Sequence, residues 1–485
     1  MTRKEKAVKS VAWSTTSAIA GGVLGPISYI FKARFLSPGE IGILAIILLV
    51  NGLVVQLLSA GFNQAIVERD KLDSESFSSL YLVNLFLSVM CTIAVIAGKD
   101  LIAFIFEMEE LKTLLIIASF QYVLVGIGNP YKGLFQREIN FKLLSIIDIV
   151  KALVLFLVTI ILLFLEFKLY AIIYANLITA ILGSLLQIYF GVRARIIPFK
   201  FIFRFSSIRS SIHFLKYYSG KLTSSYLTQN LDALIVGIFL PEYILGIYYF
   251  AKNLIDKFRM LLTNSLTSFL FPFFAEIKND FDRIRNTYLK TIDLMSLISF
   301  FVSFLIISTA DSFVAILFGE EWIDSIIVFQ VLAGSMIFSL LTNNISTSLL
   351  YARGKVKLLF YIDILSNIFF LGALLFLSKL GLEYVLLIRF SFIAVTSIII
   401  QNIANLNLEV SYKKLWSIFG NRLILNFILM CISFSIIEFL SVGTLIRGFI
   451  IVFMFFIVYF VYLFFMEKRS IEMVKGLMNR KSKAS

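Results

Sequence analysis

The chain has 485 residues, of which 59% are hydrophobic, and its mean hydropathy is +0.93. Because an average soluble domain is about 45–50% apolar, this composition excludes a soluble globular protein and predicts an all-α integral membrane protein. The formal net charge of +14 could indicate a nucleic-acid partner, but the placement of the basic residues argues against one.

Fourteen mostly apolar stretches reach the length of about 20 residues that a helix needs to cross a bilayer. They lie at approximately 11–31, 41–62, 78–98, 113–130, 143–165, 169–190, 215–240, 243–272, 288–310, 326–350, 358–378, 381–405, 421–440 and 444–466. With the N-terminus placed inside, the inner segments hold 30 Lys and Arg residues and the outer loops hold 6. Since basic residues are retained on the cytoplasmic side, we expect both termini to be cytoplasmic and the net charge to be mainly a topology signal.

Three pairs of segments form an internal repeat in the same order along the chain. FKLLSIIDI (141–149) matches VKLLFYIDI (356–364), FLSPGEIG (35–42) matches FLPEYILG (239–246), and LIAFIFEMEEL (101–111) matches FVAILFGEEWI (313–323). Six predicted spans separate the members of each pair, so the two halves enter the membrane in the same orientation, as a parallel repeat found in transporters. We therefore expect an N-terminal six-helix lobe at 1–190, a cytoplasmic interfacial linker at 191–214, a C-terminal six-helix lobe at 215–405, and two extra helices with a basic tail at 406–485.

Motifs of nucleotide-dependent and metal-dependent enzymes are missing from the sequence. It contains no G-x-x-x-x-G-K-[ST] loop, no H-E-x-x-H and no cysteine cluster. The predicted outer loops, of at most about 15 residues, leave little room for a catalytic domain. We expect no cofactor, no metal and no enzymatic activity.

Ionisable residues inside the predicted spans are the remaining candidates for chemistry. Such a residue at the centre of a span costs about 2.5–3.5 kcal/mol on insertion scales, so it usually faces a bundle interior or a wet cavity. Asp256 and Arg259 stand at the i,i+3 spacing of an ion pair within one helix. The residues concerned are Asp148, Lys151, Lys221, Asp232, Lys252, Asp256, Lys257, Arg259, Asp363 and Arg389. Structural pairing and contact with an anionic ligand both remain open for them.

Several motifs resemble the polysaccharide transporter (Wzx-type flippase) family of the multidrug/oligosaccharidyl-lipid/polysaccharide exporter superfamily. They are KARFLSPGEIGILA after the first span, NLDALIVGIFLPEYILGIYYFAKNL across spans 7 and 8, SFLFPFFAEIKND closing span 8, and FGEEW before span 10. The resemblance covers nearly the whole chain. It implies two lobes in a V around a central cavity lined by spans 1, 2, 7 and 8, in a bacterial cytoplasmic membrane.

The same resemblance implies a substrate and candidate site residues. The substrate would be an undecaprenyl-pyrophosphate-linked oligosaccharide, moved from the inner to the outer leaflet by alternating access. Cations in the cavity would complement its pyrophosphate; the candidates are Lys32, Arg34, Lys221 and Lys252. The candidates for a gate or for ion coupling are Asn230, Asp232, Asp256, Arg259, Asp148 and Asp363. Membrane lipids and a polysaccharide polymerase are the expected partners, without nucleic acid.

Two other functions stay open on the sequence. A cation-coupled small-molecule exporter of the same superfamily is the first, although the span VAWSTTSAIAGGVLGPISYIF carries no carboxylate. A membrane polysaccharide polymerase or acyltransferase is the second, and the short outer loops and the parallel repeat argue against it. Neither the sugar carried nor the energy source can be predicted from these residues.

Overall fold

The computed structural model describes residues 3–69, 72–194, 197, 199–277, 279–439 and 443–466, and these form helices joined by short turns. Fourteen long helical segments account for nearly all of them, and each corresponds to one predicted span. The segments are α1 (Arg3–Phe35), α2 (Pro38–Glu68), α3 (Ser74–Phe106), α4 (Leu111–Arg137), α5 (Phe141–Phe164), α6 (Leu169–Arg193), α7 (Phe205–Phe239), α8 (Glu242–Glu276), α9 (Phe281–Leu317), a segment Glu320–Ala352 that contains α10 (Ile326–Phe338) and α11 (Asn344–Ala352), a segment Val356–Leu380 that begins with α12 (Val356–Leu377), α13 (Leu382–Leu408), α14 (Tyr412–Phe439) and α15 (Thr444–Met466).

Eleven helices in the described part of the chain are long and apolar enough to cross a membrane. The other three long helices, α1, α7 and α8, carry more polar residues. Ser, Thr and Gly are frequent in α1, the middle of α7 reads SSYLTQNLD, and α8 holds four ionisable residues between positions 252 and 259. The fold is thus an all-α integral membrane fold whose polar character is concentrated in three helices.

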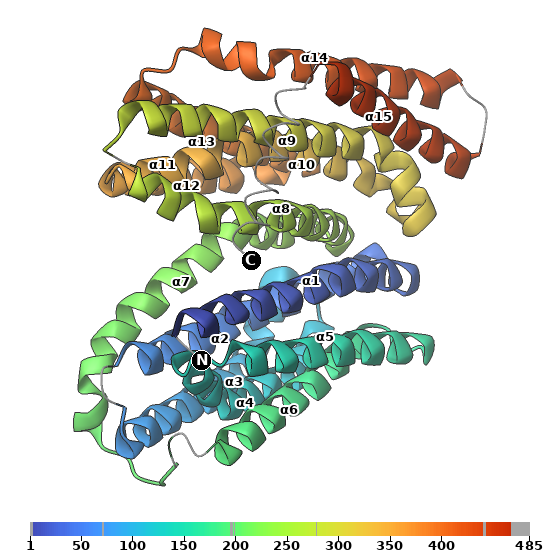
Figure 1. Cartoon of the computed structure of the whole chain (residues 1–485). Helices are drawn as coiled ribbons and strands as arrows, with labels where there is room; N and C mark the ends of the chain where they lie inside the picture. The colour runs from blue at the N-terminus through green and yellow to red at the C-terminus, as the bar shows by residue number, and fades with distance from the viewer. Residues whose placement is uncertain are drawn as a thin grey trace. The chain divides into compact units, whose positions relative to one another are not determined.

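Contacts between residues divide the chain into two compact units, Met1–Phe250 and Ala251–Ser485. In the first unit α4 packs against α2, α3 and α6, α1 runs alongside α5, and α7 packs against α2 and α3 (Figure 1). The boundary falls inside α8, whereas the sequence repeat divides the chain before α7. The two-lobe limits therefore stay a prediction, and α7 belongs to the N-terminal unit by its contacts.

The expected interfacial linker at 191–214 overlaps the ends of two helices. α6 ends at Arg193, and α7 begins at Phe205, ten residues before the predicted span at 215. Its first turns are held by Ile208, which is 3% exposed and joins a core cluster with Phe62 and Phe77. Residues 205–214 of the expected linker therefore belong to α7, and its place at the cytoplasmic interface stays a prediction.

In the second unit α9 is the helix to which the two C-terminal helices attach (Figure 1). Arg422 of α14 forms an ion pair with Asp293 of α9 at 2.6 Å, and its side chain is only 2% exposed. Arg447 of α15 lies 3.9 Å from Asp311, further along α9. Each extra helix is therefore docked by an arginine on an aspartate of the same helix.

Replacing Arg422 with Ala tests how much the first of these pairs contributes to stability. Removal of one partner leaves Asp293 without its cation, so we expect the free energy of unfolding to fall by about 3–5 kcal/mol. Thermal unfolding in detergent measures the loss. Arg447→Ala is the matched control, because its longer and more exposed pair should cost about 1 kcal/mol or less. Equal losses in the two variants would contradict this assignment.

Candidate functional site

The hairpin of α7 and α8 contains a carboxylate that is fully enclosed. Asp232 of α7 is 0% exposed, and the hydroxyl of Tyr248 on α8 donates a hydrogen bond to its Oδ2 at 2.5 Å. The backbone N–H of Ala233 donates to Oδ1 at 2.8 Å. An O–H donor at 2.5–2.7 Å from a carboxylate is typical of a charge-assisted hydrogen bond. The bond joins the two helices within the N-terminal unit.

A polar stripe continues from Tyr248 along one side of α8. Residues three or four positions apart lie on the same side of a helix, so Tyr248, Lys252, Asp256 and Arg259 follow one another along it. Lys252 is 4% exposed. Asp256 and Arg259 form the expected i,i+3 ion pair at 2.8 Å, which confirms that prediction. The stripe presents a hydroxyl, an amine, a carboxylate and a guanidinium in sequence, over about three turns of helix.

The two repeated junctions, 35–42 and 239–246, pack against each other reciprocally. A Cβ added to Gly42 would lie 2.0 Å from the carbonyl oxygen of Glu242, and one added to Gly246 would lie 1.7 Å from that of Pro38. In the repeat Gly42 is aligned with Gly246, and Pro38 with Glu242. The contact therefore has local two-fold symmetry, and it requires glycine on both sides because only a missing Cβ permits this backbone approach.

Further along α2, two more glycines admit side chains of α7. A Cβ added to Gly52 would lie 2.1 Å from the hydroxyl oxygen of Tyr226. This hydroxyl donates a hydrogen bond to the carbonyl of Leu49 at 3.0 Å. A Cβ added to Gly61 would likewise lie 2.1 Å from the Oγ of Ser219. Close packing through small residues is the usual way in which membrane helices associate. This close packing holds α7 against α2 over most of the length of α7.

The predicted cationic residues stand at different heights along these helices. Lys32 lies in the last turn of α1, half-buried, with its Nζ 5.1 Å from the centre of the Tyr29 ring. Arg34, in the same turn, is exposed, and so is Lys221 on α7. At 1.5 Å per residue, Lys32 is about 5 Å from the end of its helix and Lys221 about 27 Å from the end of α7. The structure does not bring these cations together at one point.

The other predicted gate residues have local surroundings. The amide of Asn230 donates to the carbonyl of Tyr226 within its own helix, at 2.9 Å. Asp148 is half-buried. The side chain of Lys151 extends over Gly183 of α6, and a Cβ added to Gly183 would lie 3.0 Å from it. Asp363 is exposed on α12. The gate or coupling role of Asn230, Asp148 and Asp363 stays a prediction.

Two features of this region were missed at the sequence level. Tyr248 stands in a mostly apolar stretch, and nothing in the sequence marks it as the donor of the hydroxyl hydrogen bond to Asp232. The repeat aligned Gly42 with Gly246, but nothing in a sequence match says that the aligned residues touch. No cluster of three or more His, Cys, Asp or Glu that could hold a metal ion occurs in the part of the chain that the structure describes.

The fold and the hairpin together define the class of protein. An all-α membrane fold built from a parallel repeat, with an ionisable stripe along an otherwise membrane-embedded helix, is the architecture of a transporter. The comparison with solved structures shows which fold the chain has. The chain shares its fold with "Lipid II flippase MurJ, inward closed conformation", with a TM-score of 0.68 at 15% identity over 95% of this chain and 99% of that one. It also resembles an outward-facing multidrug resistance MATE family transporter of the MOP superfamily, with a TM-score of 0.54 at 15% identity over 83% and 96% of the chains.

Comparison of sequences assigns the family. Residues 32–327 match the family model described as "Polysaccharide biosynthesis protein", so the chain belongs to that family. The lipopolysaccharide biosynthesis protein WzxC of Escherichia coli K12 is 25% identical over 374 residues, which cover 77% of this chain and 75% of WzxC. The teichuronic acid biosynthesis protein TuaB of Bacillus subtilis is 26% identical over 307 residues, 63% of each chain. The resemblance inferred from the sequence motifs is confirmed.

Replacing Gly42 with Leu tests the reciprocal contact of the two junctions. The added side chain has no room beside the Glu242 carbonyl, so we expect the free energy of unfolding to fall by about 1–3 kcal/mol. Because the contact is symmetric, Gly246→Leu should cause a similar fall. Thermal unfolding in detergent measures both. Gly98→Leu is the control, since an added Cβ there would have no neighbour within 4 Å; a loss of the same size in this variant would refute the argument.

Proposed function

We propose that this protein is a flippase that moves undecaprenyl-pyrophosphate-linked oligosaccharides from the inner to the outer leaflet of the cytoplasmic membrane. Transport would proceed by alternating access, and its product would serve the synthesis of a surface polysaccharide. The family assignment and the flippase fold support a lipid-linked substrate in general. The polar helices α1, α7 and α8 support a path for a hydrophilic group through the membrane.

One observation carries the proposal furthest, which is the buried amine of Lys252 in the α8 stripe. It lies ten residues from the start of α8, or about 15 Å at 1.5 Å per residue, close to the middle of a hydrocarbon core of about 30 Å. An ionisable residue at this depth usually marks a substrate or ion pathway. An anionic pyrophosphate passing through the membrane would complement the charge of this lysine.

The spread of the other cations suits a moving substrate better than a fixed one. The distance along the helix is about 27 Å from Lys221 to the end of α7, about 15 Å from the start of α8 to Lys252, and about 5 Å from Lys32 to the end of α1. The reciprocal packing of the junctions keeps those helix ends at one level. A pyrophosphate would meet a lysine in the inner, middle and outer part of the path. No single position would then bind it so tightly that release becomes slow.

Asp232 has a different role in this proposal. It would hold α7 and α8 together through Tyr248 while the substrate passes along the stripe. A carboxylate that repels pyrophosphate is kept out of the path by being enclosed. The enclosed carboxylate is also the feature that a cation-coupled exporter would use, so the experiment must separate the two functions.

Lys252→Ala, tested in a strain that lacks the chromosomal gene, checks the flippase directly. We expect undecaprenyl-linked oligosaccharide to accumulate, measured by mass spectrometry of lipid extracts, because loss of a charge-assisted contact of about 1.5–3 kcal/mol slows transport by about 10- to 100-fold. Lys252→Arg should clear most of the intermediate, since it keeps the charge. Lys112→Ala is the control, as Lys112 pairs with Glu109 in an exposed turn.

The outcomes separate the functions. Normal clearance by Lys252→Ala at wild-type protein levels would refute the role of this lysine. If the deletion strain itself accumulates no lipid-linked intermediate and keeps its polysaccharide, the flippase proposal fails. Increased sensitivity of that strain to small toxic cations would then favour an exporter, and polymer synthesis by the purified protein would favour a polymerase.

A further inference from the structure

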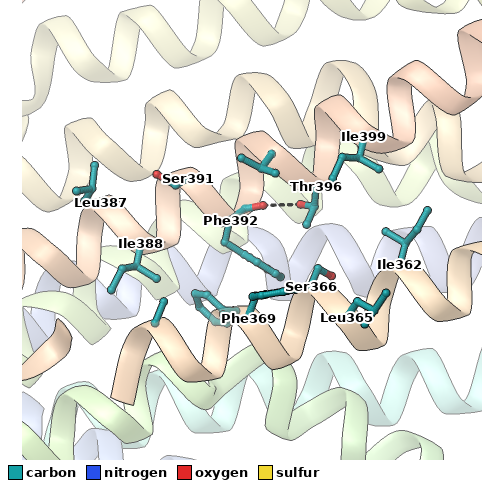
Figure 2. Close-up of a pocket in the computed structure, with 13 residues that line it drawn as sticks. Ile362, Leu365, Ser366, Phe369, Leu387, Ile388, Ser391, Phe392, Thr396 and Ile399 are labelled. Carbon is teal, nitrogen blue, oxygen red and sulfur yellow. Dashed lines mark hydrogen bonds between the residues drawn. The ribbon is translucent and has the colours of Figure 1, made fainter. Parts of the chain in front are cut away.

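A groove runs between α12 and α13 in the second unit. It encloses about 520 Å³ and is lined almost entirely by apolar side chains of the two helices (Figure 2). Phe369, Leu365 and Leu387 on its walls are 76%, 56% and 62% exposed. Both helices are membrane spans, so side chains this exposed and this apolar face lipid.

The groove offers little to a polar ligand, because Ser391 is the one polar side chain of its lining for which no hydrogen bond within the described chain is seen. Thr396 donates its hydroxyl hydrogen bond to the carbonyl of Phe392, at 2.6 Å, and Ser366 donates to that of Asp363, at 3.2 Å. Its floor is fixed by the stacked rings of Phe370 and Phe392, whose centroids are 4.3 Å apart. A hydrocarbon chain is therefore the chemistry that fits the groove.

A second pocket lies at one end of the same helix pair. It encloses about 560 Å³ and is polar, with Arg353, Gly354 and Lys355 before α12, Asn407 at the end of α13, and Asn279 before α9 among its lining residues. Ile362, the first groove residue on α12, follows Lys355 by seven positions, which is about 10 Å along the helix. The polar pocket and the groove are thus successive parts of one surface.

The charges at the two ends of the helix pair are opposite. Arg353, Lys355 and Lys357 gather at the end with the polar pocket, where the loop charges predict the cytoplasm. At the other end a pocket is lined by Asp324 and Glu383, and Lys379 stands next to its lining residue Leu380. The lining of that pocket is acidic, so an anionic group is favoured at the first end.

The depth agrees with a lipid of the inner leaflet. Groove residues from Ile362 to Phe369 lie about 10 to 21 Å from Lys355 along α12, and half of a bilayer of 40–45 Å is about 20–22 Å. A phosphate in the basic pocket would therefore place its chain in this part of the groove without leaving its leaflet. We propose that the surface formed by α12 and α13 is a binding site for an anionic phospholipid, with its phosphate at Arg353 and Lys355 and one acyl chain in the groove.

Native mass spectrometry of the purified full-length protein tests this site. Dioleoyl phosphatidylglycerol should bind more tightly than dioleoyl phosphatidylcholine, which has the same chains and no net charge. Arg353→Gln with Lys355→Gln should weaken phosphatidylglycerol binding by roughly ten- to thirtyfold, since each basic residue near an anionic head group contributes about 1 kcal/mol. The control is Lys413→Gln with Lys414→Gln, which removes two exposed charges at the start of α14.

A second pair of variants tests the groove itself. Ser366→Trp fills it and should reduce binding of both phospholipids, whereas Phe376→Trp, at an 81% exposed position on the same helix outside the groove, should leave binding unchanged. Equal binding of the two phospholipids to the wild type, or equal losses in the two double variants, would overturn the proposal. So would full competition by inorganic phosphate, or a stable dimer that covers the groove and excludes lipid.

Discussion

A polar group inside a bilayer has no water with which to form a hydrogen bond, so its partner must lie within the protein. This constraint decides which helices of the chain pack together. Apolar surfaces do not discriminate between a neighbouring helix and a lipid tail, but Asp232 requires Tyr248, and Arg422 requires Asp293. The first pair closes the α7–α8 hairpin and the second docks α14 on α9. The polar residues therefore give the bundle its specific arrangement, while its hydrophobic surface gives only its place in the membrane.

Close backbone approach is the second means of attachment, and it serves a different purpose. Hydrogen-bonded pairs fix one helix against another at a point, whereas the glycines of α2 let α7 and the start of α8 lie close to it over a long stretch. A seam of this kind depends on shape and not on charge. It can separate and close again without leaving a charge exposed to lipid.

Local signals in the sequence predicted more than distant ones. The number of spans followed from hydropathy, because each membrane helix satisfies its own backbone and leaves a long apolar stretch as its mark. The ion pair of Asp256 with Arg259 followed from helical spacing alone. Tyr248 could not be found in this way, since it meets Asp232 across a turn and resembles the apolar residues around it. Arg422 and Asp293 are 129 positions apart, and no periodicity connects them.

The attachment of α14 and α15 has a consequence for the symmetry of the molecule. In the repeat α9 corresponds to α3, since segment 313–323 matches segment 101–111 at an offset of 212 residues. At this offset Asp293 is aligned with Tyr81, and Asp311 is aligned with Lys99. Two helices that are equivalent by descent have thus become chemically different at just the positions where one of them receives an additional neighbour. Tyr81 instead takes part in an aromatic cluster with Phe77 and Tyr131. At these two positions only the second half carries the aspartates on which the arginines of α14 and α15 dock.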